Sequence, residues 1–146
     1  MTSSELGFTI RPFRLEDTEA VIELWTVSGL TRPWNDPRKD IERKLAVQAD
    51  LFVVAVTPEG RVVGCIMGGY DGHRGSMNYL ASAPDLRGAG IGFALMQHIE
   101  AELLKLGCPK INLQVRPTND GVVSYYERMG YEVAEIIDLG KRLIED

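Results

Sequence analysis

Three glycines and an arginine stand close together in the run Arg87, Gly88, Ala89, Gly90, Ile91 and Gly92. Before this run, residues 77–83 are rich in apolar and aromatic side chains, which predicts a strand that ends at Pro84 and Asp85. After it, apolar residues recur every three or four positions, which predicts a long amphipathic helix that Gly107 closes. Because glycines leave the main chain accessible and a helix N-terminus is electropositive, we expect this turn to bind an anion such as phosphate.

Two common phosphate-binding motifs do not match this run. A dinucleotide-binding fingerprint that starts at Gly88 would need its third glycine where the chain has Phe93. A P-loop needs Gly-Lys followed by Ser or Thr, but the only Gly-Lys pair is Gly140–Lys141, and Arg142 follows it. An alternative interpretation also stays open, in which the run is a glycine-rich start of a helix that binds no ligand.

A second candidate stretch lies downstream, from Asn119 to Tyr131. Asn119 opens a short helical pattern, Tyr126 lies two turns further on, and Gly130 followed by Tyr131 is a typical helix stop. Each residue also has a purely structural interpretation, since Asn119 could simply cap the helix and Tyr126 could be a core aromatic with a satisfied hydroxyl.

Together the two stretches resemble the GNAT superfamily of N-acetyltransferases. Arg87, Gly90 and Gly92 follow its Arg/Gln-x-x-Gly-x-Gly/Ala pattern, and Asn119 to Tyr131 resembles its second hallmark. The resemblance covers Phe8 to about Tyr131, and segments 32–37 and 68–75 look like small bacterial acetyltransferases of the YpeA type. It implies an α/β fold of the GNAT type, in which about four helices flank a mixed central sheet whose two parallel strands splay apart at the cofactor site.

The resemblance also implies a reaction, in which an acetyl group moves from acetyl-CoA to a primary amine by direct attack in a ternary complex. The amine would be a protein or peptide N-terminus, a lysine or a small molecule. Tyr126 matches the general acid that protonates the departing thiolate, and Asn119 matches a side chain that contacts the cofactor. The positions that match the backbone holding the thioester are Leu80, Ala81 and Ser82. The positions that match the pyrophosphate turn are Arg87, Gly88, Ala89, Gly90, Ile91, Gly92 and Phe93.

The general base is not evident in the sequence. Bacterial N-terminal protein acetyltransferases, which the chain resembles, have a glutamate at the position of Gln114, and an amide cannot accept that proton. Asp71 and His73, in the turn before the glycine-loop strand, are possible substitutes, as is bulk water. A non-catalytic acyl-CoA sensor that kept the cofactor site therefore stays open as an alternative.

Length and composition predict one domain over residues 1–146. Two cysteines and two histidines show no metal-ligand spacing, so we expect reduced thiols and no metal. A net charge of -5 with interspersed signs does not suggest nucleic acid as a partner. No stretch is long and apolar enough to cross a membrane, and no signal peptide is evident, so we expect a cytoplasmic protein. Exposed edge strands leave a monomer or a homodimer open.

The remaining pattern alternates strands and helices around these motifs. We expect strands at 8–13, 51–56, 61–70 and 110–116, a helix at 16–28, a second helix that Asp36 and Pro37 open, and one or two closing strands in 131–143. The loops 30–37 and 71–75 are the expected places for acceptor recognition, because binding residues gather on loops held by a rigid sheet. The candidate side chains there are Arg32, Trp34, Asn35 and Arg74.

Overall fold

The computed structural model describes residues 7–116 and 120–146 and divides the chain into two compact units. The first unit runs to Asn112, and the second is Leu113–Glu145. The first contains a five-stranded sheet in the order β1-β2-β3-β4-β5. The strands are β1 (Thr9–Pro12), β2 (Phe52–Val56), β3 (Val62–Tyr70), β4 (Gly75–Ser82) and β5 (Ile111–Asn112). β1 to β4 pair antiparallel and β5 pairs parallel to β4, which confirms the expected mixed sheet.

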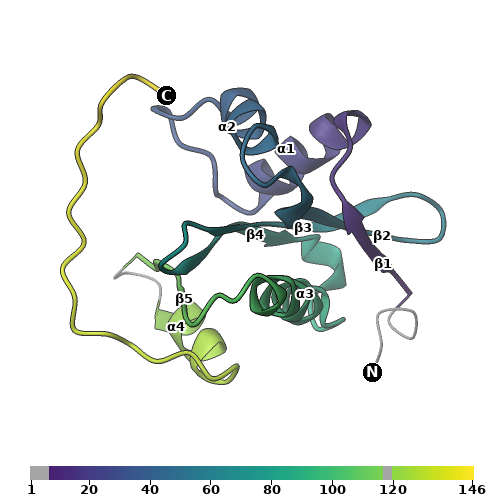
Figure 1. The fold of residues 1–146 in the computed structure, drawn as a ribbon. Coiled ribbons are helices and arrows are strands. Elements are labelled where there is room, and N and C mark those ends of the chain that lie inside the picture. The colour runs from purple at the N-terminus through teal and green to yellow at the C-terminus, as the bar shows by residue number, and fades with distance from the viewer. Residues whose placement is uncertain (1–6, 117–119) are drawn as a thin grey trace. The chain divides into compact units, whose positions relative to one another are not determined.

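Helices cover both faces of this sheet. α1 (Thr18–Val27) and α2 (Pro37–Leu45) lie over one face, and α3 (Ile91–Lys105) lies over the other (Figure 1). The expected start of α2 is confirmed, because the Asp36 carboxylate accepts from the N–H groups of Arg38 and Lys39. The remaining helix, α4 (Asp120–Glu127), belongs to the second unit. Short 3-10 turns occupy Leu15–Asp17, Ala49–Leu51 and Pro84–Leu86.

Two glycines of β3 let α3 approach the sheet closely. A Cβ on Gly64 would lie 2.6 Å from Cγ2 of Ile91, and a Cβ on Gly68 would lie 2.7 Å from Cγ2 of Ile99. No side chain fits in so little space, so these two positions need glycine. The first turn of α3, where the candidate anion site lies, therefore packs directly on the central strand.

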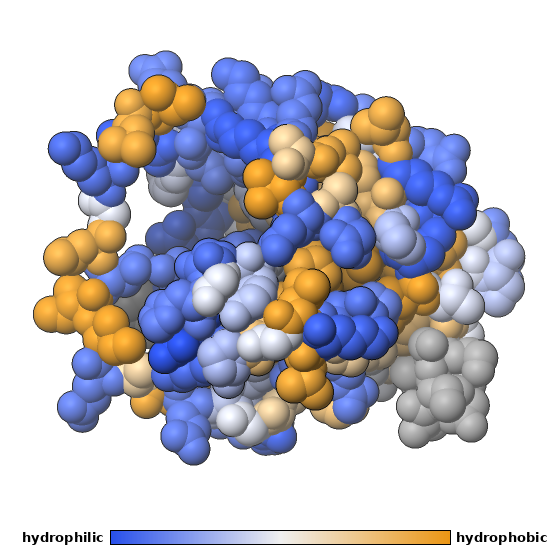
Figure 2. All heavy atoms as spheres, viewed as in Figure 1, coloured by the Kyte–Doolittle hydropathy of each residue, from blue (hydrophilic) through white to orange (hydrophobic). Residues whose placement is uncertain are grey.

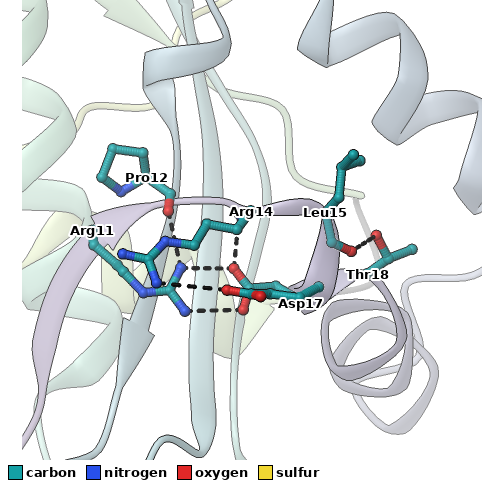
Figure 3. A network of polar contacts seen from close by, with 7 residues as sticks. Arg11, Pro12, Arg14, Leu15, Asp17 and Thr18 are labelled. Atoms are coloured by element: carbon teal, nitrogen blue, oxygen red, sulfur yellow. Dashed lines mark hydrogen bonds and ion pairs between the residues drawn. The ribbon is translucent and has the colours of Figure 1, made fainter.

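A partly buried ion pair joins β1 to the residues just before α1 (Figure 3). Arg11 Nη1 and Nη2 lie 2.7 and 3.0 Å from the two carboxylate oxygens of Asp17, which also accepts from the Arg14 N–H at 2.8 Å. Asp17 is 4% exposed. Burial alone would raise the pKa of Asp17, but the hydrogen bonds from Arg11 and from the Arg14 N–H hold it below its usual value.

The strand expected at 110–116 is much shorter than predicted. β5 pairs with β4 only through Gly75 with Ile111 and Ser76 with Asn112. The alternation of apolar and polar residues predicts an extended chain, but it does not show where the neighbouring strand diverges and the ladder of hydrogen bonds stops.

The prediction of one or two closing strands in 131–143 was wrong. The structure describes this segment as irregular and extended, without strand pairing, and Figure 2 shows it as mixed orange and blue spheres. Its apolar side chains are exposed, with Ile137 at 85% and Leu139 at 89%. Strand-like composition alone does not supply a partner strand, and without one a segment forms no ladder.

The described helices include none that is long and apolar enough to span a membrane. Within residues 7–116 and 120–146, no three His, Cys, Asp or Glu side chains gather where they could hold a metal ion. Cys65 and Cys108 are buried and free, as expected.

Candidate functional site

The glycine turn leads from β4 into α3 with two left-handed residues. Gly88 has φ +89° and Gly90 has φ +81°, values that favour glycine. The first main-chain bond of the helix runs from the Ala94 N–H to the Gly90 carbonyl at 3.0 Å. The N–H groups of the three residues before Ala94, which are Ile91, Gly92 and Phe93, precede this bond and have no acceptor in the helix. The geometry thus provides the main-chain donors that an anion needs.

The side chains of the turn divide into exposed and buried groups. Arg87 is exposed, with no hydrogen bond or ion pair to the rest of the described chain, and Phe93 is 46% exposed. Ile91, in contrast, is 3% exposed and packs beside Gly64, so only its main chain faces the turn. The Ala89 N–H is already bonded to the Leu86 carbonyl at 3.1 Å. A guanidinium and a row of amides are therefore what the turn offers to a ligand.

The edge of β4 that faces β5 is open next to the glycine turn. Strand pairing on this edge stops at Ser76, and residues 78–82 pair there with no strand in the part of the chain that the structure describes. The three expected thioester positions lie on this stretch, where Ala81 is buried and Leu80 and Ser82 are half-buried. Unpaired main-chain groups along this edge are available to hydrogen-bond an extended ligand.

A bulge interrupts β4 at a residue that the sequence interpretation missed. Met67 pairs with Asn78 and Cys65 pairs with Ala81, so Tyr79 and Leu80 together face one residue of β3. The Tyr79 ring stacks on Trp25 of α1, with centroids 3.9 Å apart, and its hydroxyl donates to Oδ2 of Asp40 in α2 at 2.5 Å. Burial and then the Asp40 carboxylate raise the pKa of Tyr79 to about 12, so the hydroxyl stays a donor at neutral pH.

The expected general acid, Tyr126, lies in α4 of the second unit. Its ring meets Tyr125 and Tyr131 edge-on, with centroids 5.5 and 6.1 Å away. Burial, and to a smaller extent Tyr125, raises the pKa of Tyr126, which keeps the phenol protonated at neutral pH. Asn119 lies outside the described residues. Because Tyr126 and the glycine turn belong to different units, their meeting at one site stays a prediction.

The candidate bases Asp71 and His73 lie in the hairpin turn, away from the bulge at Tyr79 and Leu80. The Asp71 carboxylate accepts from the N–H groups of His73 and Arg74 at 2.7 and 2.8 Å, and these bonds lower the pKa of Asp71. All of this lies at the tip between β3 and β4. Leu80 lies five positions after Gly75 along β4, a distance of up to about 16 Å in an extended strand. Gln114 is exposed in the segment after β5.

The α1–α2 loop uses its polar residues largely for its own structure. Arg32 Nη1 donates to the carbonyls of Gly29 and Thr31 at 2.6 and 2.9 Å. Asn35 Nδ2 lies 3.5 Å from Oδ2 of Asp40, so it faces the same carboxylate as Tyr79. Trp34 is 53% exposed. At the hairpin, Arg74 Nη1 donates to the His73 carbonyl at 2.9 Å.

Comparison with known proteins decides the family. The model of the acetyltransferase (GNAT) family matches residues 18–131, which include the glycine turn, the bulge and α4. The chain belongs to the GNAT family of acetyltransferases. It is 57% identical over 137 residues to an acetyltransferase of Pectobacterium atrosepticum, which covers 94% of this chain and 96% of that protein.

Solved structures support the GNAT fold. Ard1 from Thermoplasma volcanium superposes with a TM-score of 0.76 at 27% identity, covering 88% of this chain and 84% of the other. Naa20 from Chaetomium thermophilum, solved in complex with a bisubstrate analogue, gives a TM-score of 0.71 at 26% identity, covering 86% of this chain and 71% of that one. The mixed sheet and the helices on its two faces are thus those of a GNAT acetyltransferase.

Proposed function

We propose that this GNAT protein transfers an acetyl group from acetyl-CoA to a primary amine, by direct attack within a ternary complex. The observation that carries the proposal is the start of α3, where three successive amides without helix acceptors lie beside the exposed Arg87. A diphosphate is the group that such a set of donors suits best, and coenzyme A carries one. Naa20, a structural neighbour, was solved with a bisubstrate analogue, which agrees with a ternary complex.

The open edge of β4 would hold the other end of the cofactor. In this proposal the main chain of Leu80, Ala81 and Ser82 hydrogen-bonds the thioester end of acetyl-CoA. When a neutral amine attacks the carbonyl carbon, negative charge develops on the carbonyl oxygen, and an N–H of this stretch stabilises it. The attacking nitrogen, now cationic, loses a proton to water, the tetrahedral intermediate collapses, and the carbon–sulfur bond breaks to release the thiolate of coenzyme A.

Tyr126 would supply the proton that the departing thiolate needs. Burial raises the pKa of Tyr126, so it holds its proton over the whole neutral range. An ordinary thiol has a pKa of about 8.5, below that of the phenol, so the transfer is uphill and depends on close placement of the two groups. Asn119 is the side chain we expect to contact the cofactor nearby.

The acceptor amine is a protein or peptide N-terminus, a lysine or a small molecule. As parts of the same proposal, residues 1–146 act as one domain, in the cytoplasm, as a monomer or a homodimer. The buried free thiols of Cys65 and Cys108 agree with a reducing compartment.

The test is to incubate the protein with acetyl-CoA and a panel of amines, namely peptides with free N-termini, lysine peptides, polyamines and amino acids, and to follow free thiol. We expect saturable thiol release with at least one acceptor. Arg87→Ala should raise the KM for acetyl-CoA about tenfold, since it removes a charge-assisted contact. Lys105→Ala, which removes a positive charge at the other end of α3, is the matched control and should change KM less than about twofold.

A second candidate function, that of a non-catalytic acyl-CoA sensor, rests on Gln114. This amide stands where the N-terminal acetyltransferases that the chain resembles are expected to have a glutamate. If acetyl-CoA binds saturably but no acceptor releases thiol, the chain is better described as an acyl-CoA sensor. If acetyl-CoA does not bind at all, both functions are contradicted.

A further inference from the structure

Tyr79 is an aromatic residue in a backbone conformation that rarely suits one. Its φ is +55°, and Gln48 is the other non-glycine residue with positive φ in the described chain. A bulky side chain is strained in this region, and the conformation persists only where surrounding contacts impose it. Because Tyr79 lies in β4, beside the candidate cofactor site, its strained conformation suggests that it serves the function of this site.

Contacts from two helices impose this conformation. The Tyr79 ring stacks on Trp25, whose side chain is fully buried in α1, at an interplanar angle of 17°. The hydroxyl donates to Asp40 in α2, whose side chain is only 18% exposed. Both helices lie on the sheet face opposite α3. Tyr79 is thus held by α1 and α2, which lie on the sheet face opposite the helix α3 that follows the glycine turn.

The fixed residue is the first residue of the bulge. Tyr79 and Leu80 share a single opposite residue in β3, and the regular register returns at Ala81. The Tyr79 carbonyl accepts from the thiol of Cys65 at 3.7 Å. The bulge lies on the part of β4 whose other edge has no paired strand among the described residues. A bulge turns main-chain N–H and C=O groups away from the hydrogen bonds between the strands. Here it does so directly before Ala81 and Ser82.

We propose that Tyr79 is a positioning residue, which Asp40 and Trp25 hold so that the bulged main chain at Leu80 meets the acetyl group of acetyl-CoA. This inference rests on the proposed function, because it assumes that acetyl-CoA lies along β4. It goes further in assigning the placement of the acetyl group to a tyrosine–carboxylate pair between β4 and α2. Coenzyme A without the acetyl group does not need this placement, so the pair should matter for one ligand and not for the other.

The experiment measures binding of acetyl-CoA and of free CoA by titration calorimetry. Tyr79→Phe keeps the ring on Trp25 and removes the hydroxyl, and Asp40→Asn keeps Tyr79 and removes the charge that it faces. Each variant should weaken acetyl-CoA binding about tenfold and change CoA binding less than about twofold. The double variant should be no weaker than either single one, because both remove the same interaction.

Tyr70→Phe is the matched control, because Tyr70 lies at the end of β3 and its hydroxyl donates to the Gly72 carbonyl in the hairpin turn. It should bind both ligands as the wild type does. Equal weakening of acetyl-CoA and CoA, or no change for either ligand, would overturn the positioning role while leaving the proposed function intact. A wild-type protein that binds neither ligand would overturn the proposed function and this inference with it. Asp40→Asn lies outside the sheet, so it tests the idea even if Tyr79→Phe folds poorly.

Discussion

At the scale of single residues, the chemistry of this protein depends on two tyrosines with different tasks. Burial raises the pKa of both Tyr79 and Tyr126, so each stays protonated at neutral pH. The Tyr79 hydroxyl already donates a hydrogen bond to a carboxylate within the protein, which suits a positioning role. Tyr126 makes ring contacts with Tyr125 and Tyr131, and among the described residues its hydroxyl makes no comparable hydrogen bond, which is compatible with the proposed role as acid.

Replacing Tyr126 by Phe should therefore reduce kcat at least about a hundredfold, the usual contribution of a general acid, and leave the Kd for acetyl-CoA within about twofold. Tyr125→Phe is the matched control, because Tyr125 is the neighbouring half-buried tyrosine of the same helix. Steady-state kinetics and calorimetry measure the two quantities. An unchanged kcat in Tyr126→Phe would remove this residue from the mechanism.

The pH profile offers a second check on Tyr126. An acid must be protonated to act, so kcat should fall only when pH rises above the pKa of Tyr126, which burial places above its ordinary value of about 10. We expect no loss of kcat from this group between pH 7 and pH 9. A fall in kcat across that window that Tyr126→Phe abolishes would contradict the direction of the pKa shift.

At the scale of elements, the sequence predicted best what local chemistry determines. The helix start at Asp36 and Pro37 and the helix stop at Gly107 each follow from short-range rules, and the structure has both of them. The Tyr79–Asp40 contact joins residues 39 positions apart and depends on a register shift in β4, which no local pattern encodes. The same limit explains the closing strands that were expected in 131–143 and are not formed.

Gly64 tests how closely α3 and β3 are matched. In Gly64→Ala the new methyl group would lie 2.6 Å from Cγ2 of Ile91, the first residue of α3, so the Ile91 side chain or the backbone that carries it must shift. We expect a loss of about 2 kcal/mol in the free energy of unfolding and weaker acetyl-CoA binding. Gly69→Ala, in the same strand with its nearest contact at 3.4 Å, should lose less than about 1 kcal/mol. Urea denaturation of both variants decides whether the close approach matters.

The Arg11–Asp17 pair should make stability depend on pH in the acid range. Its hydrogen bonds hold the pKa of Asp17 below the unfolded value of about 3.9, so the stabilisation is complete above that pH and is lost as pH falls through the folded pKa. Asp17→Asn should cost about 2 kcal/mol at pH 7, and the difference from wild type should shrink below about pH 4. Asp85→Asn breaks an exposed pair with Arg61, which water and salt screen, and should cost much less than Asp17→Asn. A constant difference between pH 7 and pH 3 for Asp17→Asn would contradict the shift.

At the scale of the whole molecule, the candidate site residues are distributed over two units of one GNAT chain. The first carries the glycine turn, the open edge of β4 and the fixed bulge. The second carries Tyr126. The proposed acid therefore belongs to a different unit from the proposed pyrophosphate turn.

The most direct measurement follows the main-chain amides by nitrogen–proton correlation spectroscopy during a titration with acetyl-CoA. The account predicts that the largest shifts fall on Gly88 to Phe93, above all on the three amides at the start of α3, and that they saturate together with smaller shifts at Leu80 to Ser82. Saturable binding that leaves the amides of residues 88–93 unmoved would contradict the central claim.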